Sequence, residues 1–184
     1  MKRVVKILSV VILFFVVCTS QLAAQKCKFD YNKKDHITDE QSKGITFVIS
    51  AGSMFYTIER PMQWKLELHR VGNKYSVSMF ATFGGNVRNI VTPENTIIFK
   101  LTSGELITIH ANDNYPPDAH INPNSNNIVS IYNTKYDISV EDLRKIAASP
   151  LIYLKMEIGG NSYDYEFNAK KGEDFQNKAT CILQ

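Results

Sequence analysis

The sequence lacks a long hydrophobic run. Its main apolar stretch, Val10–Val17, is far shorter than the about 20 apolar residues that a membrane-crossing helix needs. A basic start precedes this stretch, and small residues ending at Ala24 follow it. This order predicts a cleavable secretory signal peptide over residues 1–24, with no membrane span after cleavage, and one β-rich globular domain over residues 25–184. A retained amphipathic anchor is the less favoured alternative.

Cysteine is scarce, with three residues in the whole chain. Cys18 lies within the predicted signal peptide, where a bacterial lipoprotein would carry its acylated cysteine. Val17 precedes it at a position where such signals usually have a small residue, so lipid anchoring is not expected. Cys27 and Cys181 are expected to form a disulfide in a secreted or periplasmic protein, and two unpaired cysteines are the alternative.

The sequence also lacks an excess of basic residues once the signal peptide is set aside. The chain has 21 Lys and Arg against 18 Asp and Glu. Three of the basic residues and none of the acidic ones lie in residues 1–24, which leaves 18 of each sign. A nucleic-acid surface needs a concentrated basic stripe, so no nucleic-acid partner is expected.

Sequence motifs of catalysis and of phosphate binding are missing. The surroundings of Ser53 do not form the GxSxG elbow, and the chain contains neither HExxH nor a glycine-rich phosphate loop. Glu67, Glu157 and Glu166 fall on polar strand faces, where carboxylates are usually only solvated. No catalytic residue, metal or cofactor is therefore predicted, and a protein without catalysis is favoured over an enzyme.

Segments of alternating hydrophobic and polar residues dominate the chain from Gly44 onward, after an expected irregular lead-in over residues 26–43. Ile45–Ser50 and Met54–Ile58 have strand composition. Period-two alternation then predicts antiparallel hairpins, two of them with Gly-Asn turns. The expected hairpins cover residues 64–83, 96–111 and 152–167. The two similar Gly-Asn hairpins leave open a duplicated half-domain.

Two helices are expected. Ser139 begins a capping-box pattern, which predicts a helix near residues 139–148, and apolar residues at helical spacing predict another near residues 172–182. Sheets with one solvated face are mostly antiparallel. The predicted fold class is therefore α+β and mainly antiparallel β, folded or packed as a sandwich.

The segment 112–127 is unusual because it holds three prolines and six asparagines between strands. A loop of this length in a compact domain is often functional, so we predict a binding loop. Its candidate binding residues are Tyr115, Asp118 and His120. The candidate metal ligands are His110, Asp113, Asp118 and His120, although their spacing fits no metal motif. A solvent-facing histidine is the simpler interpretation of His110.

Aromatic residues are plentiful, with nine tyrosines and ten phenylalanines. Phe80 and Tyr153 fall out of phase with the apolar faces of their strands. Exposed aromatic residues on sheets are common on surfaces that bind sugars or proteins. We expect instead that a helix covers these two residues.

These observations predict an exported, non-catalytic binding or accessory protein that acts through a sheet face and the 112–127 loop. The expected partner is an unknown envelope protein or a glycan. One alternative is a secreted or periplasmic hydrolase whose carboxylates are assembled only by the fold. Another is a structural or inhibitor-like envelope protein.

Overall fold

The computed structural model describes residues 27–51, 61–121 and 127–184. Three predicted features lie outside the described residues: the signal peptide with Cys18, the surroundings of Ser53, and the strand over Met54–Ile58. Among the helices that are described, none has the length and apolar character needed to cross a membrane.

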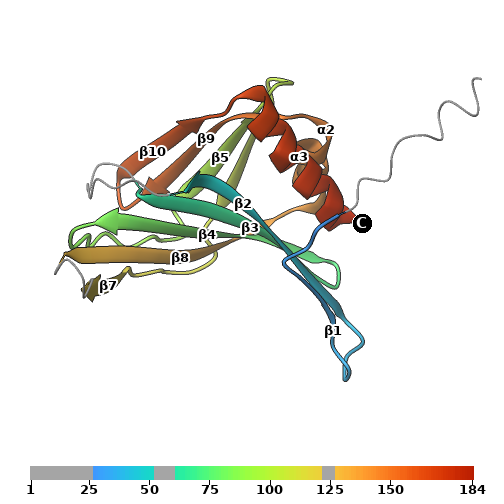
Figure 1. Ribbon diagram of the computed structural model, residues 1–184, viewed down its shortest axis with the longest axis horizontal. Helices are drawn as coiled ribbons and strands as arrows, with labels where there is room; N and C mark the ends of the chain where they lie inside the picture. The colour runs from blue at the N-terminus through green and yellow to red at the C-terminus, as the bar shows by residue number, and fades with distance from the viewer. Residues whose placement is uncertain (1–26, 52–60, 122–126) are drawn as a thin grey trace, which may run out of the picture.

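The described strands form two antiparallel sheets (Figure 1). The larger sheet has the strand order β1-β2-β3-β4-β8-β7 and the smaller one the order β10-β9-β5-β6. The six strands of the larger sheet are β1 (Tyr31–Lys34), β2 (Gln41–Ala51), β3 (Gln63–Val71), β4 (Lys74–Gly84), β7 (Asp118–Ile121) and β8 (Ile128–Ile138). The smaller sheet contains β5 (Thr96–Leu101), β6 (Leu106–His110), β9 (Leu151–Ile158) and β10 (Asn161–Glu166). The α+β, mainly antiparallel fold class is confirmed.

The three predicted hairpins are confirmed as β3–β4, β5–β6 and β9–β10. Gly72 and Gly160 have φ values of 57° and 86°, in the left-handed region that glycine adopts without steric cost. The expectation of an irregular lead-in is wrong, because residues 31–34 and 41–44 pair as β1 and the start of β2. Strands β7 and β8 were not predicted.

Both predicted helices are present, as α2 (Val140–Ala148) and α3 (Ala169–Leu183). The Ser139 hydroxyl accepts the Asp142 backbone N–H at 3.0 Å, as the capping box predicts. Helix α3 begins earlier than expected, because Asn168 caps it by accepting the Lys171 N–H at 3.0 Å.

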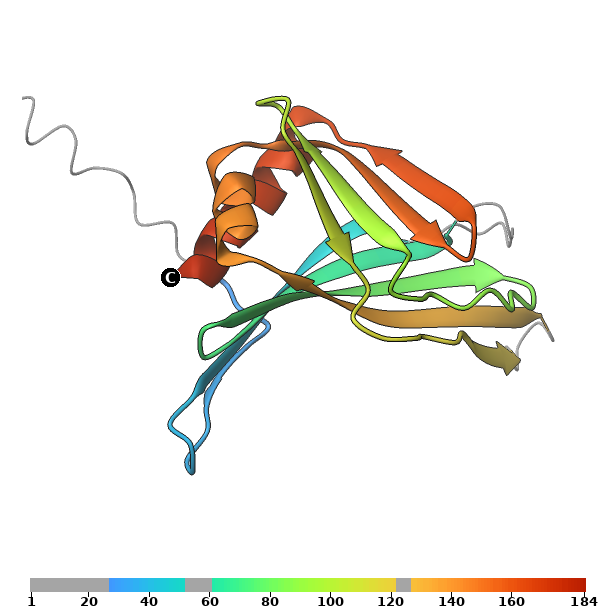
Figure 2. The same cartoon turned by 180° about the vertical axis from the view of Figure 1, so that it is seen from behind.

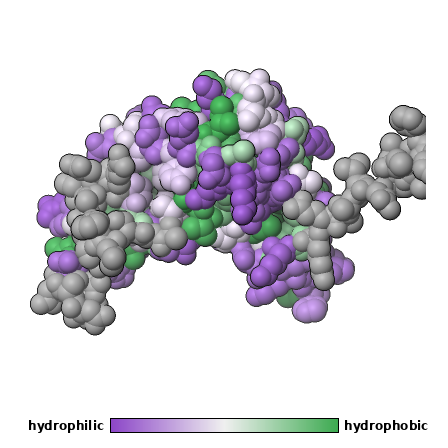
Figure 3. All heavy atoms as spheres, turned by 45° about the horizontal axis from the view of Figure 1, so that its top comes forward, coloured by the Kyte–Doolittle hydropathy of each residue, from purple (hydrophilic) through white to green (hydrophobic). Residues whose placement is uncertain are grey.

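The smaller sheet and both helices lie over one face of the larger sheet (Figures 1 and 2). Phe175 of α3 packs between the sheets, with ring centroids 4.9 Å from Phe47 of β2 and 5.7 Å from Phe99 of β5. Viewed from the side of α3, the described surface is mostly hydrophilic with narrow apolar patches (Figure 3). No described helix or strand layer covers the opposite face of the larger sheet, which we call the outer face.

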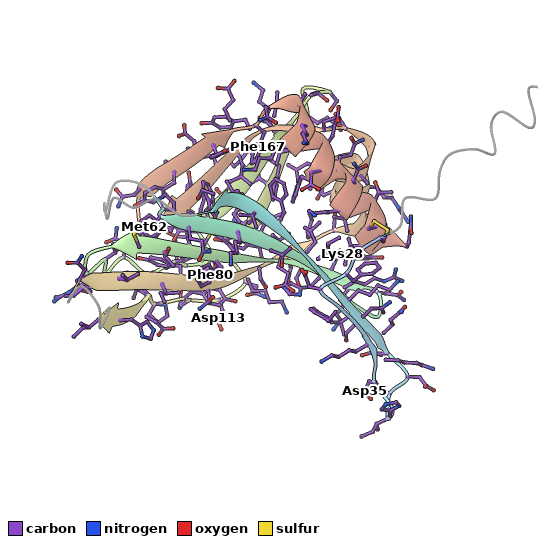
Figure 4. The ribbon with its side chains drawn as sticks, viewed as in Figure 1. Lys28, Asp35, Met62, Phe80, Asp113 and Phe167 are labelled. Atoms are coloured by element: carbon purple, nitrogen blue, oxygen red, sulfur yellow. A yellow bond between two sulfur atoms is a disulfide. The ribbon has the colours of Figure 1, made fainter. Side chains whose placement is uncertain are left out.

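The predicted disulfide joins Cys27 to Cys181 near the end of α3, with the two Cα atoms 5.5 Å apart (Figure 4). Arg70 of β3 also holds the end of α3, because its guanidinium donates a hydrogen bond to the Leu183 carbonyl at 3.2 Å. The first described residue and the C-terminal helix are therefore fixed to each other.

Candidate functional site

The outer face of the larger sheet carries polar side chains because successive residues of a strand point to opposite sides. Strand register places these side chains in rows across β2, β3, β4 and β8. One row contains Thr46, Glu67, Ser78 and Lys135, and the next contains Val48, Lys65, Phe80 and Asn133. The apolar residues between them, such as Leu66 and Met79, face the core.

A hollow of about 440 Å³ lies over these two rows. Tyr115, from the segment between β6 and β7, forms part of its wall. The backbone of Tyr115 is held to Val91 by two hydrogen bonds of 2.7 and 3.1 Å, and its hydroxyl donates to the side-chain oxygen of Asn112. The structure thus brings a residue of the predicted binding loop onto a sheet face.

Phe80 contributes a second aromatic ring to the hollow. It points away from the helices, on the outer face (Figure 4), and the Lys65 ammonium lies 5.4 Å from its ring centroid. The expectation that a helix covers Phe80 is wrong. It is wrong for Tyr153 as well, because that side chain lies on the solvent side of the smaller sheet and donates to Asp164.

The charged residues that line the hollow are Lys65, Glu67 and Lys135. Neither lysine forms an ion pair with any described residue. Burial, followed by the nearby charge of Asp30, raises the pKa of Glu67. The hollow therefore presents two unpaired ammonium groups and one carboxyl whose charge is disfavoured.

Glu67, His69 and Tyr31 form a cluster beside the hollow. His69 Nδ1 lies 2.7 Å from the Tyr31 hydroxyl and 3.5 Å from a Glu67 carboxyl oxygen. Burial, followed by the positive charge of Lys135, lowers the pKa of His69. A neutral imidazole can accept a hydrogen bond from the Tyr31 hydroxyl at Nδ1, and this bond ties strand β1 to the centre of the sheet.

Gly44 makes room for this cluster. A Cβ atom at this position would lie 2.2 Å from the Tyr31 ring and 2.6 Å from the Glu67 carboxyl oxygen. Both are closer than van der Waals contact allows, so Tyr31 and Glu67 can occupy these positions only because residue 44 has no side chain.

The lowered pKa of His69 makes stability depend on pH. The unfolded chain binds a proton at this imidazole near its ordinary pKa of 6.5, whereas the folded protein binds it only at lower pH. Stability should therefore fall as the pH drops from about 7 to about 5.5, because the unfolded state takes up more protons in that window. Denaturant unfolding of the wild type and of His69→Gln at both pH values measures this, and the variant should lose less. Equal losses in the two proteins would contradict the role of His69.

The structure separates the other predicted site residues. His110 ends β6 of the smaller sheet, Asp113 lies in the following segment, and Asp118 and His120 are exposed on the edge strand β7 of the larger sheet. Within residues 27–51, 61–121 and 127–184, no three His, Cys, Asp or Glu side chains group so that they could hold a metal ion. Tyr115 alone of these candidates lines the hollow.

The three carboxylates considered from the sequence do not meet either. Glu67 is on the outer face, while Glu157 and Glu166 belong to the smaller sheet. Glu157 accepts a hydrogen bond of 2.9 Å from Thr96 and pairs with Lys155 at 3.3 Å, and Glu166 is exposed.

Two residues of the hollow, Asn133 and Lys135, were missed because strand β8 was not predicted. The available signal was the alternation of Asn133, Lys135 and Asp137 with Tyr132, Thr134 and Tyr136.

Comparison of the chain with protein-family models, curated proteins and solved structures finds no match.

Proposed function

We propose that this protein is an exported, non-catalytic binding protein that holds a glycan chain across the outer face of its larger sheet. The observation that carries the proposal is the hollow in which Phe80 and Tyr115 stand beside polar side chains. Sugar rings have apolar C–H faces and polar rims, so they suit a site that combines aromatic rings with a few placed hydrogen-bonding groups.

The polar groups of the hollow match the hydroxyl groups of a sugar. A sugar hydroxyl both donates and accepts, and Thr46, Ser78 and Asn133 can do the same. Glu67 supplies an acceptor, and the two lysines supply donors. A flat polymer could therefore form hydrogen bonds with several of these groups at once while one of its sugar rings stacks on Phe80.

Binding without catalysis is supported by the arrangement of the nearby carboxyl groups. Hydrolysis of a glycosidic bond usually needs two carboxyl groups that flank it. Glu67 is the one carboxyl group among the described residues that line the hollow, and Asp30, whose charge acts on Glu67, lies outside that lining. Export is supported by the Cys27–Cys181 disulfide, because such bonds persist in oxidising compartments.

Phe80→Ala and Tyr115→Ala are each expected to weaken glycan binding roughly tenfold, the effect of losing one stacked aromatic ring. Affinity electrophoresis through gels that contain neutral or acidic polysaccharides measures the binding. Tyr153→Ala is the matched control, because it removes an aromatic side chain from the solvent side of the other sheet. Binding that survives in both hollow variants, or that Tyr153→Ala weakens equally, would place the glycan elsewhere.

A further inference from the structure

We infer that the glycan held by the outer face is acidic, with carboxylate groups along its chain, and that Lys65 and Lys135 bind these groups. This inference rests on the proposed function and adds the class of ligand. It depends on the charged side chains around the hollow and on which of them already have partners.

The two lysines are available to a ligand. Lys65 contacts the Phe80 ring and Lys135 is exposed, and no described carboxylate lies within ion-pair distance of either ammonium group. The described residues thus leave two cations in one hollow without an ion-pair partner. A carboxylate that reaches either one gains a charge-assisted hydrogen bond.

Three other acids near the hollow each already accept a hydrogen bond. Asp30 accepts from the Thr46 N–H at 2.6 Å, and Asp113 from the Asn114 N–H at 2.7 Å. Asp137 accepts from the Asn112 side chain at 3.5 Å. None of these three lines the hollow, so its lining holds two cations against Glu67 alone.

The spacing of the lysines favours a polymer over a single carboxylate. Lys65 is on β3 and Lys135 on β8, with β4 between them, and the two lysines lie two residues out of register. Their backbones are therefore about 12 Å apart on the sheet. One carboxylate cannot contact two ammonium groups at that separation unless both side chains bend toward it. A chain with a carboxylate on each sugar can reach both while its rings cross Phe80.

The test compares binding of the intact secreted protein to polygalacturonate with its binding to neutral galactan, by isothermal titration calorimetry. We expect polygalacturonate to bind at least tenfold more tightly, and we expect the difference to shrink when NaCl rises from about 0.05 M to about 0.5 M. Lys65→Gln and Lys135→Gln should each weaken polygalacturonate binding roughly tenfold and weaken any galactan binding less, because glutamine keeps an N–H donor for a sugar hydroxyl but carries no charge. The matched control is Lys100→Gln, because Lys100 is an exposed lysine on the solvent side of the smaller sheet.

The outcomes separate this inference from the proposed function. Equal binding of both polysaccharides that depends on Phe80 would overturn the inference and keep the proposed function. Binding of neither would overturn both. Polyaspartate or a sulfated glycan that binds as tightly as polygalacturonate would show a general polyanion site and overturn the assignment of a carboxylated glycan. An equal effect of Lys100→Gln would place the binding lysines outside the hollow.

Discussion

Replacing Gly172 with alanine is expected to lower the free energy of unfolding by roughly 3 kcal/mol, at the upper end of the cost of overpacking a core. Gly172 lies within α3, and a Cβ atom there would stand 2.1 Å from the Leu151 backbone oxygen at the start of β9. Backbone atoms cannot swing aside as a flexible side chain can. Helix α3 would have to move away from the sheet and loosen the contacts of Phe175.

The sign of the result separates packing from helix propensity. In an exposed helix, glycine to alanine stabilises by about 1 kcal/mol, so a gain in stability would contradict the close approach of α3 to β9. Urea unfolding followed by circular dichroism measures the change. Glu173→Ala, at the exposed neighbouring position, is the control and should change stability by less than about 0.5 kcal/mol.

Loss of the Cys27–Cys181 disulfide is expected to have an effect of similar or greater size. The bond closes a loop between residues separated by 154 positions, and the chain-entropy relation gives about 5 kcal/mol as an upper value for such a loop. The double variant Cys27→Ser/Cys181→Ser should therefore unfold at much lower denaturant concentration. Guanidinium titrations with fluorescence detection of Trp64, the single tryptophan, measure the midpoint and the slope.

Reduced wild-type protein is the comparison for this experiment, because it lacks the bond but keeps both sulfur atoms. It should lose nearly as much stability as the double variant. Both should also show a steeper dependence on denaturant, since an unfolded chain without the cross-link exposes more surface. Oxidised and reduced protein with equal midpoints would contradict a stabilising role for the bond.

Much of the fold was predictable because local chemistry and the tertiary structure agree. The Gly72 and Gly160 turns and the alternation around them specify hairpins, and Ser139 specifies the start of α2. Gly172 shows the limit. The sequence predicts a helix that begins near this glycine, whereas Asn168 caps α3 earlier and Gly172 lies inside the helix, where it allows α3 to pack closely on Leu151.

Strand β8 escaped prediction because its buried face is only partly apolar. Ser130 and Thr134 lie on it together with Tyr132 and Tyr136, and all four are buried. The Ser130 hydroxyl accepts the Val87 N–H and donates to the Gly85 carbonyl, each at 2.8 Å, and the Tyr132 hydroxyl donates to the Asn89 carbonyl at 2.7 Å. Such partners are distant in sequence, so a hydrophobicity pattern cannot reveal them.

The candidate site was predictable only in pieces. Tyr115 and Phe80 were both noticed in the sequence, but nothing in it shows that they share one hollow. Their meeting in one hollow depends on the pairing of β4 with β8 and on the β-bridge between Tyr115 and Val91. Glu67 alone resembles any solvated carboxylate, and its raised pKa arises from burial that the fold creates.

The disulfide between Cys27 and α3 determines how the protein can be attached in a binding measurement. Cys27 is bonded to α3, so a tag or linker joined at either end of the described chain leaves the molecule beside Cys181, whereas Phe80 points out from the far side of the sheet (Figure 4). Attachment to a sensor surface through either end should therefore present the hollow outward, open to polymers far larger than the protein.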